Sequence, residues 1–241
     1  MKRLIAVIPA RYESSRFPGK PLASIAGKTM IHRVYERVNA LSCFEQVIVA
    51  TDDERIYAEV ESFGGKAVMT GECSCGTERV YEAIKDVDAD IVINIQGDEP
   101  LIKQEMILDL VHAFDDESVQ MATLKKKIET QREIEAPNVV KVITDCNDDA
   151  IYFSRFTIPF NRDHQLVDYY KHIGIYGYTK TFLAKYVSLP ESFLEKTEKL
   201  EQLRVIENGY KIRVKETKYE SIGVDLPEHI QLVEEQLKNE Q

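Results

Sequence analysis

The 241-residue sequence has no long hydrophobic run, and no apolar stretch approaches the roughly 18 residues that a membrane-spanning helix requires. The apolar run near its start, LIAVI at residues 4–8, is too short for a signal peptide, and no small-residue cleavage site follows it. These absences argue against membrane insertion and export. We therefore expect a cytoplasmic protein.

Cysteine is also scarce, with four residues at positions 43, 73, 75 and 146. Their spacing matches no zinc-binding pattern, because the C-x-C pair at Cys73 and Cys75 has no second pair to complete it. Free thiols in a reducing compartment are the simpler interpretation.

Positive charge is in deficit, with 31 Lys and Arg against 41 Asp and Glu and a net charge of −10. This balance argues against nucleic-acid binding, which needs a broad basic face. A local basic pocket for one anionic ligand remains compatible with it. The stretch IPARYESSRFPGKPL, residues 8–22, is such a concentration, because Arg11, Arg16 and Lys20 flank Ser14 and Gly19. Cations, hydroxyls and backbone N–H groups in one loop suit a polyphosphate, whereas the alternative is a solvated loop with scattered ion pairs.

Strands and helices alternate through the first half of the chain. Buried strands are expected at 4–8, 46–51, 66–70 and 90–96, and amphipathic helices at 30–41, 54–63, 77–87 and 104–114. Continuously apolar strands between amphipathic helices are typical of a parallel sheet covered on both faces. We therefore expect an α/β fold with a mostly parallel nucleotide-binding sheet flanked by helices.

The second half is more mixed. Strands are expected at 139–144, 151–154, 172–179 and 211–216, helices at 181–189, 192–209 and from 227 onward, and a polar loop at 161–171. The alternation in HIGIYGYT places His172, Tyr176 and Tyr178 on one face of their strand. A lone strand histidine is more often a packed residue than a functional one.

Acidic residues follow several of the expected strands. Asp98 lies in QGDEP after a buried strand, and Asp225 ends ESIGVD before the last helix. Such carboxylates hold Mg²⁺ when phosphates supply further oxygens, provided that their strands lie close together. The alternative for Asp98 is an ordinary Asp-Glu-Pro turn. Asp52, in VATDD, is expected to cap the following helix.

The ordered set of these motifs resembles one family, the 3-deoxy-manno-octulosonate cytidylyltransferases or CMP-Kdo synthetases. The resemblance covers nearly the whole chain and is carried by IPARYESSRFPGKPL, VATDD, GTER, INIQGDEP, PNVVKV, YFSR, HIGIYGY, LEQLRVIENGYKI and GVD-x-PE. PGKPL is shared by many sugar nucleotidyltransferases. QGDEP together with HIGIYGY and EQLR is much more specific.

The resemblance implies a fold, an activity and an assembly. The fold would be a single Rossmann-like nucleotidyltransferase domain over 1–241, with a nucleotide-binding core at about 1–118 and 211–241 and a smaller, mixed sugar-binding and dimerisation lobe at about 119–210. The enzyme would convert CTP and 3-deoxy-D-manno-octulosonate (Kdo) into CMP-Kdo and pyrophosphate for lipopolysaccharide or capsule synthesis. It would use Mg²⁺ and work as a homodimer.

The family's functional residues carry over to matching positions of this sequence. Lys20, Asp98 and Asp225 would be catalytic, and the two aspartates would bind the metal. The nucleotide would be held by Arg11, Ser14, Lys20, Gly76, Thr77 and Arg79. The sugar would be held by Gln96, Arg155, His172, Tyr176, Glu201 and Gln202. On pattern alone, a solvated helix face is the favoured interpretation for Glu201 and Gln202.

The sequence departs from the family in its nucleotide loop. Cys73 and Cys75 stand where family members usually carry His and Ser, and Leu226 stands where Thr is usual. These differences leave open a related acceptor, such as 8-amino-Kdo or a sialic acid. A catalytically silent nucleotide-binding module is the alternative from outside the enzymes.

Overall fold

The computed structural model describes residues 2–14 and 16–239. These form two compact units, one running up to Gln104 and resuming at Glu220, the other comprising Glu105–Tyr219. The lobe predicted at about 119–210 lies within the second unit. Within the described residues, no helix has the length and apolar character needed to cross a membrane.

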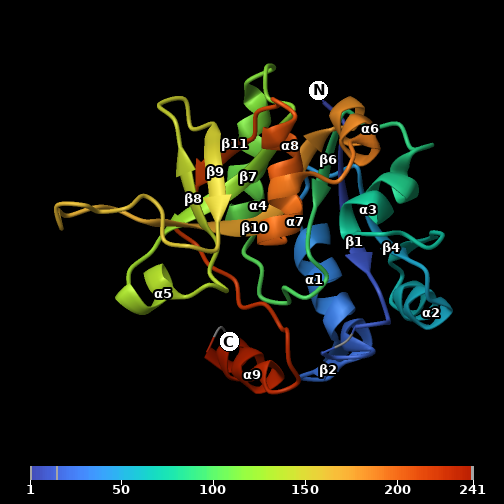
Figure 1. The fold of residues 1–241 in the computed structure, drawn as a ribbon. Helices are drawn as coiled ribbons and strands as arrows, with labels where there is room; N and C mark the ends of the chain where they lie inside the picture. The colour runs from blue at the N-terminus through green and yellow to red at the C-terminus, as the bar shows by residue number, and fades with distance from the viewer. Residues whose placement is uncertain (1, 15, 240–241) are drawn as a thin grey trace. The chain divides into compact units, whose positions relative to one another are not determined.

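The first unit is built on a four-stranded parallel sheet in the order β6-β1-β4-β5. Figure 1 labels the first three of these strands. Its strands are β1 (Leu4–Ala10), β4 (Gln46–Thr51), β5 (Lys66–Met69) and β6 (Ile91–Asn94). Its other elements are η1 (Lys20–Leu22), β2 (Ser24–Ile25), β3 (Lys28–Thr29), α1 (Met30–Asn39), α2 (Glu54–Ser62), α3 (Gly76–Ile84) and α9 (His229–Asn239). The predicted mostly parallel sheet with flanking helices is confirmed.

Apolar residues fix the layers of this unit. Val7, Ile48 and Val92 on three adjacent strands are completely buried. Helices α1 and α3 contact β1 and β4, while α2 contacts β4 and β5. Burial of these faces drives the helices onto the sheet. The loops after the parallel strands therefore gather at one edge.

The helix starts follow local capping rules, with one correction to the prediction. Thr29 caps α1 by accepting a hydrogen bond from the backbone N–H of His32. Asp53, and not Asp52 as predicted, caps α2 by accepting one from the N–H of Arg55. Asp52 instead forms an ion pair with Arg79. Adjacent aspartates satisfy the same capping pattern, so the pattern alone chose the wrong one.

The second unit combines a mixed sheet with short helices. Its strands are β7 (Met121–Lys127), β8 (Lys141–Thr144), β9 (Ala150–Ser154), β10 (Tyr170–Thr179) and β11 (Arg213–Glu216). Its helices are α4 (Gln104–Val111), η2 (His112–Asp115), α5 (Gln131–Glu135), α6 (Lys180–Ser188), α7 (Phe193–Glu198) and α8 (Leu203–Glu207). Strand β7 pairs antiparallel with β10 and parallel with β11, and β8 and β9 form an antiparallel pair.

Strand β7 was not among the predicted strands. Its sequence, MATLKKK, ends in three lysines and reads as a solvated segment. The structure nevertheless buries Lys125, whose ammonium donates to Asp148 at 3.0 Å and to Thr144 at 2.8 Å. A buried charge is tolerated when it is paired and hydrogen-bonded.

The single helix predicted at 192–209 is wrong. It is two short helices, α7 and α8, separated at Lys199, which has a left-handed backbone with φ of 54°. In β10, a register irregularity between Ile173 and Tyr176 leaves His172 and Tyr176 opposite Lys125 and Thr123. The expected common face of these two side chains is therefore kept.

Candidate active site

The basic loop after β1 is folded back on itself around Gly19. Gly19 has a left-handed backbone with φ of 71°, which glycine adopts without steric cost, and its N–H donates to the carbonyl oxygen of Tyr12 at 2.8 Å. The Tyr12 ring lies against Gly19, and the Arg55 guanidinium stacks on that ring at 3.2 Å from its centroid. The loop thus delivers Lys20 at the start of η1.

Lys20 connects the two aspartates that the sequence singled out. Its ammonium lies 2.5 Å from Asp98 Oδ2 and 3.9 Å from Asp225 Oδ1. Arg16 donates to the same Asp225 oxygen at 2.9 Å. We call these four residues the charged cluster. All of them belong to the first unit, so the expected convergence of Lys20, Asp98 and Asp225 is present in the structure.

Backbone contacts and apolar packing hold the two carboxylates in place. A Cβ at Gly97 would lie 3.0 Å from the Pro9 carbonyl oxygen, so glycine lets the loop before Asp98 approach the end of β1. The N–H of Val224 donates to the carbonyl oxygen of Asp98 at 2.9 Å. Val224 is buried in an apolar cluster that joins the C-terminal helix to the start of the chain and consists of Ile25, Met30, Leu101, Val224 and Val233.

Glu99 adjoins the charged cluster and was not predicted. Burial, reinforced by the negative charge of Asp98, raises the pKa of its carboxyl to about 8, against a smaller opposing effect of the Ser221 hydroxyl. Among the described residues, Glu99 Oε2 and Ser221 Oγ are buried without a well-formed hydrogen bond. Glu99 is therefore mainly uncharged at neutral pH, which keeps a third negative charge out of the cluster.

A cavity of about 440 Å³ opens beside the basic loop, in the first unit. It is lined by Arg11, Tyr12, Glu13, Asp52, Asp53, Glu72, Cys73 and Arg79. Arg79 is only 1% exposed and donates to Thr70 Oγ1 and Asp52 Oδ2, each at 2.5 Å. It thereby ties the ends of β4 and β5 to α3.

The other predicted nucleotide residues lie around the same loops. Gly76 and Thr77 open α3, directly after Cys75, which makes no side-chain capping bond. Ser14 Oγ accepts a hydrogen bond from the N–H of Phe17 at 3.4 Å, so it stabilises the turn of the basic loop. These residues therefore lie on loops of the first unit, and their assignment to the nucleotide stays a prediction.

Within the described residues, no group of three or more His, Cys, Asp or Glu side chains could hold a metal ion. Asp98 and Asp225 nevertheless suit Mg²⁺, which binds through one or two carboxylates and takes its remaining oxygens from substrate phosphates and water. Both carboxylates already lie around one cation, the Lys20 ammonium. The donor set therefore fits the metal that the resemblance implies.

In the second unit, His172 and Tyr176 lie with their ring centroids 5.4 Å apart. Burial lowers the pKa of His172 to about 3, so its imidazole is neutral at physiological pH. Its Nε2 is 2.9 Å from Thr123 Oγ1, which also donates to the carbonyl oxygens of Ile173 and Ile175. Since the hydroxyl has a single proton, we infer that Nε2 donates and Nδ1 is the acceptor nitrogen.

Arg155, Glu201 and Gln202 come from neighbouring parts of the second unit. The Arg155 guanidinium donates to the carbonyl oxygens of Glu198 at 2.8 Å, Pro137 at 3.3 Å and Lys199 at 3.4 Å, and so spans the end of α7. Glu201 is exposed, whereas Gln202 is 3% exposed. The solvated helix face considered for this pair is therefore wrong for Gln202. Gln96, the remaining predicted sugar residue, lies in the first unit.

Gln202 carries an unsatisfied group. Its Nε2 is buried and makes no hydrogen bond to a described part of the chain. An unpaired buried donor costs about 1–3 kcal/mol. The buried N–H₂ group is therefore available to a bound ligand or a water molecule.

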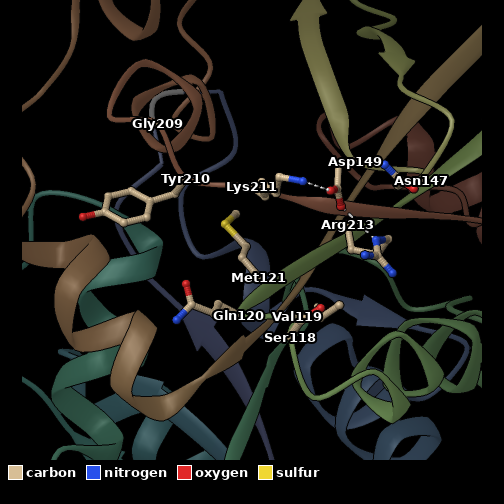
Figure 2. Close-up of a pocket in the computed structure, with 10 residues that line it drawn as sticks. All are labelled: Ser118, Val119, Gln120, Met121, Asn147, Asp149, Gly209, Tyr210, Lys211 and Arg213. Carbon is tan, nitrogen blue, oxygen red and sulfur yellow. Dashed lines mark hydrogen bonds and ion pairs between the residues drawn. The ribbon is translucent and has the colours of Figure 1, made fainter.

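The second unit also contains a cavity of about 440 Å³. Figure 2 shows its lining, which consists of Ser118, Val119, Gln120, Met121, Asn147, Asp149, Gly209, Tyr210, Lys211 and Arg213. Asp149 accepts hydrogen bonds from Lys211 at 2.8 Å and from Arg213 at 2.9 Å, so both cations are already neutralised. None of the predicted site residues lines this cavity.

Comparisons with known proteins identify the family of this chain. The cytidylyltransferase family model matches residues 5–213. The chain is 52% identical to the 3-deoxy-manno-octulosonate cytidylyltransferase of Solibacter usitatus, over 96% of this chain and 93% of that protein. It is 49% identical to the enzyme of the same name from Geotalea uraniireducens, over 98% of this chain and 99% of that protein.

Solved structures give the same result. CMP:2-keto-3-deoxy-manno-octonic acid synthetase complexed with CTP superposes with a TM-score of 0.96 at 44% identity, covering 99% of this chain and all of that one. The 4-diphosphocytidyl-2C-methyl-D-erythritol synthase of Anaerococcus prevotii, at 18% identity and a TM-score of 0.66 over 98% of this chain and 99% of that one, shares the fold alone. The chain belongs to the 3-deoxy-manno-octulosonate cytidylyltransferase family.

Proposed function

We propose that this protein transfers the CMP group of CTP to Kdo, giving CMP-Kdo and pyrophosphate. The observation that carries the proposal is the charged cluster, in which Lys20 reaches both Asp98 and Asp225 at the edge of a parallel sheet. Its relatives support the choice of substrates, since those at 52% and 49% identity carry the name of this activity.

We assign the nucleotide to the first unit. Lys20 and Arg11 neutralise the triphosphate, and Ser14 shapes the loop that holds both of them. The cavity lined by Arg11 and Arg79 is where we place the nucleoside, next to the Gly76-Thr77 start of α3. Its carboxylates suit the hydroxyl and amino donors of a cytidine.

Asp98 and Asp225 would hold Mg²⁺ in this proposal. When bound, the metal offsets the repulsion between two anionic substrates and lowers the pKa of the attacking hydroxyl. Lys20 contacts Asp98 directly and so keeps the two carboxylates at one place before substrates arrive.

The chemistry needs no covalent intermediate. The anomeric hydroxyl oxygen of the sugar forms a bond to the α-phosphorus of CTP, the bond from that phosphorus to the bridging oxygen breaks, and pyrophosphate leaves with the electron pair. The hydroxyl proton is lost to solvent. Lys20 and Arg11 stabilise the negative charge that grows on the leaving phosphates.

We assign sugar binding to Gln96, Arg155, His172, Tyr176, Glu201 and Gln202. The orphaned Nε2 of Gln202 and the acceptor nitrogen of His172 are groups that a polyhydroxylated sugar can satisfy. The Arg155 guanidinium supplies positive charge for the sugar's carboxylate.

A homodimer in the cytoplasm completes the proposal. The segment between β9 and β10 projects from its own sheet (Figure 1) and exposes Phe156, Phe160 and Leu166, of which Phe160 is 85% exposed. A segment that exposes three large apolar side chains suits a protein interface. The cysteines are free, which accords with a reducing compartment.

The test is an assay with CTP, Mg²⁺ and one acceptor at a time, Kdo, 8-amino-Kdo or a sialic acid, with CMP-sugar detected by mass spectrometry and pyrophosphate measured in parallel. We expect a CMP conjugate with Kdo. A conjugate with another acceptor only would reassign the substrate. CTP binding without pyrophosphate release from any acceptor would show a non-catalytic module.

A further inference from the structure

Arg16 has no assigned role, yet it contacts a residue proposed to bind metal. Its guanidinium Nη2 donates to Asp225 Oδ1 at 2.9 Å, while Lys20 is 2.5 Å from Asp98 Oδ2. Each carboxylate of the pair thus has a cation from the basic loop as its near partner. Two carboxylates that share a site repel each other, so a cation must lie between or beside them.

The two cations are held differently. The Lys20 side chain is 17% exposed and reaches both carboxylates. The Arg16 side chain is 63% exposed and its partner Asp225 is 49% exposed. An ion pair at this exposure is weak and easily replaced. Arg16 is therefore the exchangeable partner, and Lys20 is the fixed one.

We propose that Arg16 is an exchangeable counter-ion, which neutralises Asp225 when no divalent cation is bound and turns to the nucleotide's phosphates when one is. The inference rests on the proposed function, because it requires Asp225 and the basic loop to serve one nucleotide site. A divalent cation on Asp225 and the Arg16 guanidinium, which contacts Oδ1, compete for the same carboxylate. Arginine has five N–H donors in a fork that matches phosphate, so the freed side chain gains a strong new partner.

The exchange couples two binding events. Cation binding releases Arg16 to the phosphates, and phosphate binding removes Arg16 from the carboxylate. Such coupling is reciprocal, because each ligand must change the affinity of the other by the same factor. It adds to any direct contact between the metal and the nucleotide.

The first arm of the test measures Mn²⁺ binding without nucleotide, by electron paramagnetic resonance of free Mn²⁺. We expect Arg16→Gln to bind Mn²⁺ about two- to fivefold more tightly than the wild-type protein, the range that corresponds to an exposed ion pair. Arg3→Gln is the matched control, because Arg3 pairs with Asp88 and Asp90 before β1 and β6, at the other ends of these strands. Its Mn²⁺ affinity should equal that of the wild type.

The second arm measures CTP binding by calorimetry without sugar acceptor, with and without saturating Mg²⁺. The metal–CTP complex that forms in solution changes the apparent CTP affinity of both proteins by the same factor. This factor cancels in the ratio of variant to wild-type affinity. We expect Arg16→Gln to lose several-fold in affinity with Mg²⁺ and much less without it. An equal loss in both conditions, or Mn²⁺ binding no tighter than in the wild type, would overturn the inference.

Two further measurements keep the proposals separable. Asp225→Asn should weaken Mn²⁺ binding. An unchanged Mn²⁺ affinity would show that the ion does not bind to this carboxylate, and the inference would then be wrong. If Arg16→Gln shows the expected change but the wild-type protein forms no CMP-sugar, the counter-ion exchange stands and the proposed activity fails. A thermal melt of Arg16→Gln near that of the wild type confirms that an exposed side chain was removed from a folded protein.

Discussion

Replacing Asp98 or Asp225 by Asn separates catalysis from stability in the charged cluster. Asp98 lies 2.5 Å from a Lys20 side chain that is 17% exposed, whereas Asp225 is 49% exposed and pairs with an Arg16 that is 63% exposed. The first contact is partly buried and the second is open to water. The two substitutions should therefore differ in their effect on folding.

The magnitudes follow from these exposures. A hydrogen bond to a charged group contributes about 1.5–3 kcal/mol, and Asp225 at 3.9 Å remains as a partner for Lys20, so Asp98→Asn should cost about 1–2 kcal/mol. In a chain of this size that lowers the melting temperature by about 2–8 °C. Asp225→Asn should cost less than about 1 kcal/mol. Both should lower turnover by about 10²–10³ or more, because the proposed Mg²⁺ loses a carboxylate ligand and with it the charge stabilisation that the metal would supply.

The assay is pyrophosphate release from CTP and Kdo at saturating Mg²⁺, read beside a thermal melt of each variant. Asp225→Asn is the sharper case, since we expect a protein as stable as the wild type that is nearly inactive. Turnover close to the wild-type rate in this variant would refute the assignment of the carboxylate pair. Loss of activity that tracked loss of folding in both variants would refute it as well.

Three further predictions concern the second unit. The pKa of His172 is lowered from 6.5 to about 3 in the folded protein, so only the unfolded chain binds a proton on this histidine as the pH falls below 6.5. The contribution of His172 to stability should therefore be complete above about pH 6.5 and decline below it. His172→Gln should flatten this decline in urea titrations. Glu195→Ala removes the carboxylate that accepts two hydrogen bonds from Arg204, at 2.7 and 2.5 Å, and should lower the free energy of unfolding in urea by about 3 kcal/mol. The exposed control Lys196→Ala should lower it by less than about 1 kcal/mol. Gln202→Leu should leave stability nearly unchanged, since the amide nitrogen that it removes is buried and unpaired, while raising KM for Kdo; an unchanged KM would contradict the sugar assignment.

Periodicity was a good guide wherever a segment was uniformly apolar. Strands β1, β4 and β6 are short apolar runs between amphipathic helices, and their parallel pairing follows from that order. Strand β7 was not predicted because its lysines are typical of a solvated segment, although Lys125 is buried and forms an ion pair with Asp148. The break between α7 and α8 at Lys199 was not predicted, because no sequence pattern indicates a left-handed backbone at a residue other than glycine.

Prediction of the site residues from sequence also succeeded only where a local pattern applied. The rule that loops at the carboxyl ends of parallel strands share one edge brought Arg11, Lys20 and Asp98 together from sequence. Asp225 follows no strand of this sheet, and its position depends on a backbone hydrogen bond from Val224 to Asp98 and on the burial of Val224. Those contacts join segments more than a hundred residues apart, which no local pattern encodes.

Arg79 shows how a predicted location can leave the role of a side chain open. The resemblance placed it at the nucleotide, and it does line the cavity beside the basic loop. Two of its nitrogens, however, are already used by Thr70 and Asp52, and only Nε is buried without a partner among the described residues. A side chain that is 1% exposed and tied at both ends cannot swing toward a ligand, so its contribution is to hold the ends of β4 and β5 where the cavity forms. The Asp52 that was expected to cap a helix is the anchor for this arginine, so neither the capping pattern nor the resemblance predicted this ion pair.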